Sequence, residues 1–311
     1  MHIERRPEYI PVARVEFPSV EDFRQRYDLP QIPVVITGAM NDWKAMAEWD
    51  HAWFTSFDRT PVALSLERTH TTRSRNTTVA KYAESILNET DGGHYMDQFP
   101  LESIPTLKDY VAALYAPADQ ANAMNLWLGP ANTEISFHKD NHDPFQLNCN
   151  IFAQIRGRKR ILLVSPAFDE AMYPRTPDMG AHWHSQVDHN NPDFERFPKF
   201  RDAQIQETIL HPGEMLFIPG NYWHSVRALD KSVSVSCWWY THRLVDVLTA
   251  GMRAIPAGFS FERINAADLE AFGGAKRLLQ MTDMLEQKSP GTRQAILTLC
   301  QADVLELMAQ A

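Results

Sequence analysis

The sequence predicts a mainly β fold with flanking helices, in which the middle of the chain forms a sandwich or a barrel. Residues 232–238 alternate strictly, with valines on one face and serines on the other, the period-two pattern of a strand with unlike faces. Two apolar runs, 151–155 and 160–164, are separated by Gly157 and predict two strands joined by a tight turn. Such strands suit a wall that packs on one side and lines a polar cavity on the other.

The chain divides by pattern into three regions. Residues 1–90 predict an N-terminal α/β region that packs on the core, with a buried strand at 33–38 and three tryptophans after it that we expect in the core. The polar residues 67–78 predict a loop. Residues 91–245 carry most of the predicted strands. Residues 246–311 predict three helices from apolar residues at helical spacing, and these helices are a possible dimerisation element.

Composition and net charge narrow the classes of protein to which this chain can belong. The 311 residues are 44% hydrophobic and 22% charged, as in ordinary globular proteins, and the net charge of −9 argues against general nucleic-acid binding. Three well-separated cysteines predict no disulfide framework. No apolar stretch reaches the length of a membrane span, and the charged start lacks an apolar signal region, so we expect a cytoplasmic protein.

Three residues form a candidate metal site. His138 and Asp140 are one residue apart in a β region, so both side chains lie on the same face of a strand, and the distant His224 can complete a triangle. Two imidazoles and one carboxylate on one face of a metal form the facial triad of non-haem Fe(II) oxygenases, which leaves positions for a chelating 2-oxo acid and O2. The His-x-Asp pair alone is weak evidence, because the same pattern serves as a surface ion pair or a strand-end cap.

The surrounding motifs resemble the Jumonji-C (cupin-like) oxygenases, and are most similar to the single-domain asparaginyl and arginyl protein hydroxylases. The motifs that carry this resemblance are residues 125–130, 133–140, 150–160, 185–188, 191–200, 211–219, 222–224 and 227–239. The resemblance covers about residues 30–245, and the last part of the chain has no counterpart in it. It implies a double-stranded β-helix (jelly-roll) core and an enzyme that uses Fe(II), 2-oxoglutarate and O2.

The resemblance also implies roles for individual residues. It makes His138, Asp140 and His224 the iron ligands, and Lys159 the cation that holds the distal carboxylate of 2-oxoglutarate. A charge-assisted hydrogen bond of this kind contributes roughly 1.5–3 kcal/mol. Without the resemblance, Lys159 would be interpreted as a solvated lysine of a hairpin.

Further co-substrate contacts are implied at Tyr95, Asn150 and Ser236. The plainer interpretations are a core aromatic for Tyr95 and ordinary strand hydrogen bonds for the other two. Trp127 is implied as a wall of the substrate pocket, and core packing is the alternative.

The chain departs from the family pattern in two places. The family has Thr or Ser three residues before the first histidine ligand, where this chain has Ile135 followed by Ser136. Either a β-bulge turns Ser136 inward to 2-oxoglutarate, or that hydrogen bond is absent. Residues 141–149 add a loop or bulge after the ligand pair, from which His142 is a candidate substrate contact. Two other histidines, His182 and His184, are expected to be ordinary loop residues.

The sequence therefore predicts a dioxygenase that hydroxylates an amino-acid side chain of a protein or peptide, with succinate and CO2 as co-products. An Nε-methyl-lysine or arginine demethylase and a small-molecule hydroxylase are alternatives with the same iron centre. A metal cupin of another reaction class and a non-catalytic cupin-like binding protein are alternatives of a different kind. The first of these does not need Lys159, and the presence of all three metal ligands argues against the second.

Overall fold

The computed structural model describes residues 7–28, 31–57, 59–66, 73–116, 121–140, 147–176, 179, 183–241, 269, 274–288, 293, 296–297 and 300–310. The chain forms two compact units, one made of residues 1–140 and 149–239 and the other of residues 141–148 and 240–311. Among the described residues, no helix is both long enough and apolar enough to cross a membrane.

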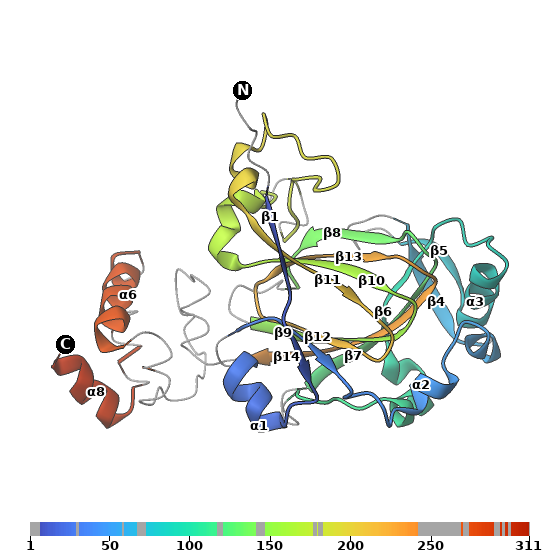
Figure 1. Cartoon of the computed structure of the whole chain (residues 1–311), viewed down its shortest axis with the longest axis horizontal. Coiled ribbons are helices and arrows are strands. Elements are labelled where there is room, and N and C mark those ends of the chain that lie inside the picture. Colours follow the sequence, from blue (N-terminus) through green and yellow to red (C-terminus); the bar gives the residue numbers. More distant parts are fainter. Residues whose placement is uncertain are drawn as a thin grey trace. The chain divides into compact units, whose positions relative to one another are not determined.

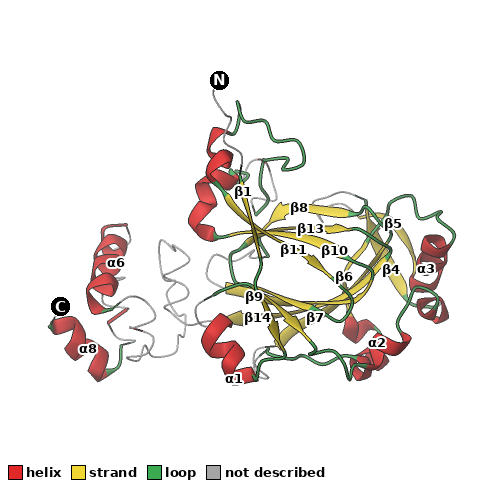
Figure 2. Cartoon of the chain, viewed as in Figure 1, coloured by secondary structure: helices red, strands yellow, loops and turns green. Residues whose placement is uncertain are grey.

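Two sheets form the framework of the first unit, and they face each other in Figures 1 and 2. The five-stranded sheet has the order β1 (Glu8–Pro11), β11 (Gln204–Leu210), β10 (Lys159–Val164), β13 (Trp223–Ala228), β8 (Glu134–His138). The seven-stranded sheet has the order β2 (Arg14–Glu16), β3 (Val34–Thr37), β12 (Met215–Ile218), β9 (Leu147–Arg156), β14 (Ser232–Thr241), β7 (Ala121–Gly129), β6 (Met96–Pro100). A separate ribbon pairs β4 (Pro61–Ser65) with β5 (Arg73–Thr78).

The order of these strands confirms the double-stranded β-helix. From β7 to β10 the chain passes from one sheet to the other at every step, and it does so again from β11 to β14. The pairs β10–β11, β10–β13, β13–β8, β12–β3, β12–β9, β14–β7 and β6–β7 are antiparallel, whereas the N-terminal strands β1 and β2 pair parallel with β11 and β3. This winding encloses a space between the sheets that strands from distant parts of the sequence can reach with their side chains.

Short helices accompany the sheets. The α-helices are α1 (Val20–Phe23), α2 (Lys44–Glu48), α3 (Val79–Leu87), α6 (Ala275–Lys288) and α8 (Ala302–Ala309). The other helical turns are η1 (Arg24–Asp28), η2 (Trp53–Ser56), η3 (Leu101–Ser103), η4 (Pro105–Tyr110), η5 (Pro166–Met172) and η7 (Pro198–Asp202). Two of the three expected C-terminal helices are present as α6 and α8, and the first falls outside the described residues. The boundaries at 90 and 245 and the dimer stay predictions.

Three apolar cores stabilise the first unit. One lies between the outer face of the seven-stranded sheet and the N-terminal helices, where Trp49 is fully buried as predicted. A second lies between the two sheets and includes Phe152. The third lies between the outer face of the five-stranded sheet and the segment that carries η5 and η7, and includes Phe137. Apolar burial on both faces of each sheet makes the sheets rigid supports for side chains in the space between them.

Strand β14 shows how the alternating pattern divides these cores. Val233 and Val235 pack in the core beneath the N-terminal helices. The serines face the other way, and Ser234 donates a hydrogen bond to Gln154 Oε1 at 2.8 Å. The predicted strand with one apolar and one polar face is therefore confirmed.

The polar segment 67–78, expected to be a loop, is partly a strand. Residues 73–78 form β5, which pairs antiparallel with β4. Arg75 and Asn76 are exposed, and backbone pairing supplies the hydrogen bonds of the ribbon, so no alternation of apolar residues is needed. Polarity alone therefore gave the wrong prediction here. Residues 67–72 lie outside the described part of the chain.

The turn between β9 and β10 requires glycine. Gly157 has φ +69°, and a Cβ atom built on it would overlap the backbone carbonyl of Lys231. We expect Gly157→Ala to lower the free energy of unfolding by about 1–3 kcal/mol or more, measured by urea denaturation. Gly213→Ala is the matched control, because Gly213 has φ +89° but a Cβ atom built on it would make only an ordinary van der Waals contact with Met46. Equal losses in the two variants would show that the close approach to Lys231 contributes nothing.

Candidate active site

A cavity lies between the two sheets. It is lined by Tyr95, Trp127, Thr133, Glu134, Ile135, His138, Asp140, Asn150, Phe152, Lys159, Ile218, His224, Val226, Ala228 and Trp238. Seven of the predicted site residues are in this lining. Ser136 and Ser236 are not in it, and His142 lies outside the described residues.

Strands β8 and β13 bring the three expected metal ligands together. They pair antiparallel with His138 directly opposite His224, and the two imidazole centroids are 4.1 Å apart. Asp140 Oδ1 lies 3.8 Å from His138 Nε2 and 3.5 Å from His224 Nε2. Within the described residues, this is the one group of three His, Cys, Asp or Glu side chains with ligand atoms all within 4.8 Å of one another.

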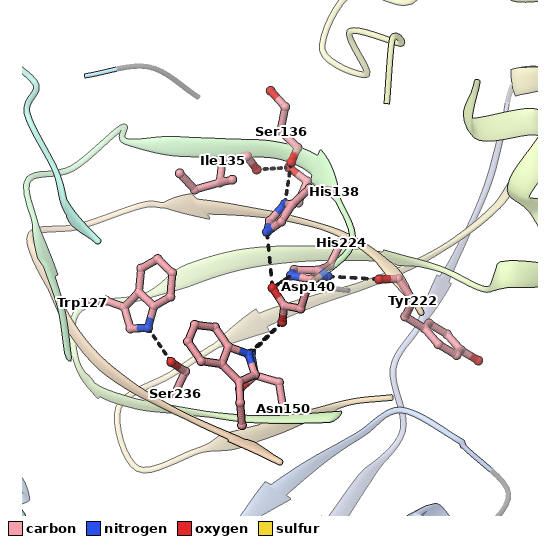
Figure 3. Close-up of polar contacts among 11 residues, drawn as sticks. Trp127, Ile135, Ser136, His138, Asp140, Asn150, Tyr222, His224 and Ser236 are labelled. Atoms are coloured by element: carbon pink, nitrogen blue, oxygen red, sulfur yellow. Dashed lines mark hydrogen bonds and ion pairs between the residues drawn. The ribbon is translucent and has the colours of Figure 1, made fainter. Parts of the chain in front are cut away.

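The two imidazoles are held so that the same nitrogen of each faces the centre of the group. His138 Nδ1 lies 2.8 Å from the carbonyl oxygen of Ser136, and His224 Nδ1 lies 3.1 Å from that of Tyr222 (Figure 3). A carbonyl only accepts hydrogen bonds, so it selects the tautomer with the proton on Nδ1. The lone pair is then on Nε2, which is the arrangement that metal-binding histidines use.

The carboxylate of Asp140 is oriented by two donors. Trp238 Nε1 donates to Oδ2 at 2.9 Å and Asn150 Nδ2 donates to the same oxygen at 3.3 Å, so that Oδ1 faces the imidazoles (Figure 3). Burial alone would raise the pKa of Asp140, but the adjacent His224 and His138 rings and the Trp238 bond hold that pKa below its usual range. The residue is therefore an anion whose Oδ1 faces the two imidazoles, and this donor set fits a divalent iron.

The far end of the cavity holds a buried cation. Lys159 is 1% exposed, its Nζ donates to the hydroxyl of Tyr95 at 2.9 Å, and it lies 4.8 Å from the centroid of Phe152. Among the described residues, no carboxylate forms an ion pair with it. Burial lowers the pKa of Lys159 from 10.5 to about 7, which reflects the cost of keeping this charge away from water. An anionic ligand would remove that cost, so this end fits the distal carboxylate of 2-oxoglutarate.

Asn150 offers a further polar contact in the lining. Its side-chain nitrogen is used by Asp140, while its side-chain oxygen is buried and has no hydrogen-bond partner within the described part of the chain. A buried acceptor of this kind costs free energy until a donor or water reaches it. Asn150 therefore links the Asp140 carboxylate to the lining of the cavity.

A bulge, one of the two alternatives for this position, is present in β8, but it does not bring Ser136 into the cavity. His138 pairs with His224 and Ile135 with Val226, so two residues of β8 stand opposite one residue of β13. The bulge puts both Ile135 and His138 on the cavity face, and Ser136 lies on the side of β8 away from Asp140 (Figure 3). Ile135, and not Ser136, therefore lines the cavity at this position.

Ser236 does not line the cavity but contacts a residue that does. Its hydroxyl accepts a hydrogen bond from Trp127 Nε1 at 2.7 Å (Figure 3). That bond fixes the indole of Trp127, which does line the cavity, between Tyr95 and Trp238. The serine therefore shapes the wall and does not touch the space inside it.

Sequence reasoning missed two neighbours of the ligands. Trp238 follows Ser232, Ser234 and Ser236 at a spacing of two, so the alternation of β14 already placed it on the inner face. His184, expected to be an ordinary loop residue, is 1% exposed, and its ring stacks on His138 with centroids 5.4 Å apart. No local pattern marks His184, because the contact comes from pairing of its segment with the end of β8.

Gly129 leaves room for the tyrosine that meets Lys159. A Cβ atom built on Gly129 would overlap the ring of Tyr95. We expect Gly129→Ala to displace that ring and to raise the Kd for 2-oxoglutarate about tenfold, the equivalent of one hydrogen bond to a charged group. Calorimetric titration under anaerobic Mn(II) measures the effect, and Mn(II) affinity itself serves as the internal control. An unchanged Kd would mean that Tyr95 does not contribute to co-substrate binding.

Comparisons with known proteins agree with this geometry. Residues 20–243 match the family model described as the cupin-like domain. The chain is 38% identical over 243 residues to Lysine-specific demethylase 8 of Xenopus tropicalis, covering 73% of this chain and 52% of that protein. It is 34% identical over 233 residues to Lysine-specific demethylase JMJ30 of Arabidopsis thaliana, covering 71% and 53%, and 26% identical over 246 residues to Jumonji C domain-containing protein 5 of Drosophila melanogaster, covering 73% and 59%.

The chain thus spans a little over half the length of these curated relatives. The family match covers the strands that carry the ligand triad, the buried lysine and the enclosing sheets. From the fold, the donor set and this match, the chain belongs to the cupin-like Jumonji-C family of Fe(II)- and 2-oxoglutarate-dependent oxygenases.

Proposed function

We propose that this protein oxidises a C–H bond in an amino-acid side chain of a protein or peptide, with 2-oxoglutarate and O2 as co-substrates. One observation carries the proposal: a single cavity holds a two-histidine, one-carboxylate triad at one end and the buried ammonium of Lys159 at the other. A 2-oxo dicarboxylate is the ligand that matches both ends, because it has a chelating group for the metal and a distal anion for the lysine.

Bound Fe(II) and 2-oxoglutarate supply the oxidising chemistry: one atom of O2 enters succinate as CO2 is lost, and the other is inserted into the substrate C–H bond. His138, Asp140 and His224 would hold the metal, and Lys159 with Tyr95 would orient the distal carboxylate of the co-substrate. The aromatic walls, Trp127 and Phe152, keep water from the reacting groups.

Removal of an Nε-methyl group from lysine is the reaction that the comparisons favour. The relatives from Xenopus tropicalis and Arabidopsis thaliana carry the name lysine-specific demethylase. The same oxidation applied to an N-methyl group gives an N-hydroxymethyl amine, which releases formaldehyde and leaves the amine. Hydroxylation of a carbon in the side chain is the second candidate, and the resemblance of residues 125–160 to single-domain protein hydroxylases supports it.

Paired peptides separate these reactions. The full chain with Fe(II) and 2-oxoglutarate would be given an N-methyl-lysine peptide, its unmethylated twin and an arginine twin, and succinate, formaldehyde and peptide mass would be followed together. Demethylation gives formaldehyde equal to the methyl groups lost, and hydroxylation gives a gain of one oxygen atom without formaldehyde. Succinate that no peptide stimulates would count against a peptide substrate, and failure to bind 2-oxoglutarate would favour a non-catalytic binding protein.

A further inference from the structure

Two residues next to the metal ligands share one carboxylate on the outer side of the five-stranded sheet. Lys139 stands between the two ligands at the end of β8, and Trp223 immediately precedes the ligand on β13. Lys139 Nζ lies 2.6 and 2.8 Å from the two carboxylate oxygens of Asp169. Trp223 Nε1 donates to Asp169 Oδ1 at 2.7 Å. One side chain from η5 therefore ties together the two strand ends that carry the triad.

The three groups also contact one another. Lys139 Nζ lies 4.8 Å from the centroid of the Trp223 ring, within the range of a cation–π contact. The lysine side chain is 15% exposed, although that of Asp169 is 47% exposed. A two-pronged ion pair with a shared indole donor has a defined geometry, unlike most ion pairs at a protein surface.

The position of Asp140 depends on the contacts of Asp169 more than the positions of the two histidines do. Both histidines lie within paired strands, whereas β8 ends at His138 and Asp140 stands beyond its last ladder pair. Lys139, which lies between His138 and Asp140 in the chain, is fixed by two contacts. Its side chain binds Asp169, and its backbone nitrogen donates to the carbonyl oxygen of Trp183 at 2.9 Å. The side-chain anchor also reaches the opposite strand, and the backbone bond does not.

We infer that Asp169 is a positioning residue for the metal centre, which fixes Lys139 and Trp223 so that the ligands beside them keep their spacing. The inference rests on the proposed assignment of His138, Asp140 and His224 as the ligands. It concerns metal affinity and not the choice of substrate. Residues outside the ligand shell that orient the ligands typically change metal affinity by about 10–100-fold when they are removed.

The test compares two neighbouring carboxylates on the same helical turn. In the full chain, Asp169→Ala is expected to raise the Kd for Mn(II) about 10–100-fold, measured anaerobically by electron paramagnetic resonance without co-substrate. Glu170→Ala is the matched control, because Glu170 also forms a 2.6 Å ion pair, with Lys199, but contacts neither strand end. Asp169→Asn keeps an acceptor for Trp223 while weakening the bond to Lys139, so an intermediate loss is expected.

Lys139→Met tests the same link from the other side. Its loss of Mn(II) affinity should not add to that of Asp169→Ala in the double variant. The ion pair between Lys139 and Asp169 is already absent in Asp169→Ala. If Asp169→Ala fails to fold, Lys139→Met and Asp169→Asn provide the measurement. Mn(II) binding within about twofold of wild type in these variants, or an equal loss in Glu170→Ala, would overturn the inference.

A reference variant separates this inference from the ligand assignment. Asp140→Ala should lose Mn(II) affinity whether or not Asp169 has a positioning role. If Asp140→Ala binds Mn(II) like the wild type, the ligand assignment itself fails. If Asp140→Ala loses the metal and Asp169→Ala keeps it, only the positioning role fails.

Discussion

Asp140→Ala is expected to reduce succinate formation by at least about 10³-fold, the scale seen when one member of a catalytic unit is removed. Asp140 supplies the only anionic ligand atom of the triad, and its Oδ1 lies 3.8 and 3.5 Å from the two imidazole nitrogens. Without it, two neutral imidazoles would have to hold a divalent ion alone. Coupled measurement of 2-oxoglutarate consumption and succinate release checks this expectation.

Asp140 also accepts hydrogen bonds from Trp238 and Asn150, so the variant must be shown to fold. Asp109→Ala is a suitable control, because Asp109 is an exposed carboxylate far along the chain from the triad. His224→Ala should match Asp140→Ala in activity, since each removes one ligand. Wild-type succinate formation by either variant would mean that the metal is held elsewhere.

Much of this centre could be predicted because its ligands follow local rules. A one-residue gap puts His138 and Asp140 on one side of the chain, and the serine-valine alternation predicted the two faces of β14. The partner of this pair, His224, lies on a strand far along the chain and was assigned by resemblance to a family, as was Lys159. Their convergence depends on the pairing of β8 with β13 and of β13 with β10, which no local pattern encodes.

The errors have physical causes as well. A β-bulge shifts the side-chain alternation by one residue, and the sequence gives no sign of which residue it turns inward. Ile135 faces the cavity instead of Ser136 for this reason. Asp169 lies 30 residues from Lys139 and 54 from Trp223, and its contact with them depends on how η5 packs on the outer face of the sheet. Such a contact becomes visible only when the strands are in place.

Lys159→Met is expected to weaken 2-oxoglutarate binding at least about tenfold while making the protein without ligand more stable. The ammonium is buried, and burial lowers its pKa from 10.5 to about 7. Between these pH values the unfolded chain holds a proton on this lysine that the folded chain releases, so stability rises with pH across the window. Below about pH 7 the folded state carries the full cost of burying the charge, on the order of a few kcal/mol.

Methionine keeps much of the length of the side chain and removes the charge. Urea unfolding of the ligand-free protein should therefore show a gain of a few kcal/mol at pH 7 for Lys159→Met, and this gain should shrink as the pH approaches 10. In the same variant, the Kd for 2-oxoglutarate under anaerobic Mn(II) should rise at least about tenfold, because a charge-assisted hydrogen bond of roughly 1.5–3 kcal/mol is lost.

The exposed Lys108 provides the matched control, since Lys108→Met removes a charge without altering a buried site. A variant at 159 that binds 2-oxoglutarate normally would show that the distal carboxylate lies elsewhere in the cavity. A variant at 159 that loses 2-oxoglutarate binding but gains no stability would show that the ligand-free protein already offsets the free-energy cost of the buried ammonium. Only the combined result, lost binding with gained stability, has the signature of a charge kept in an apolar cavity for the anion it binds.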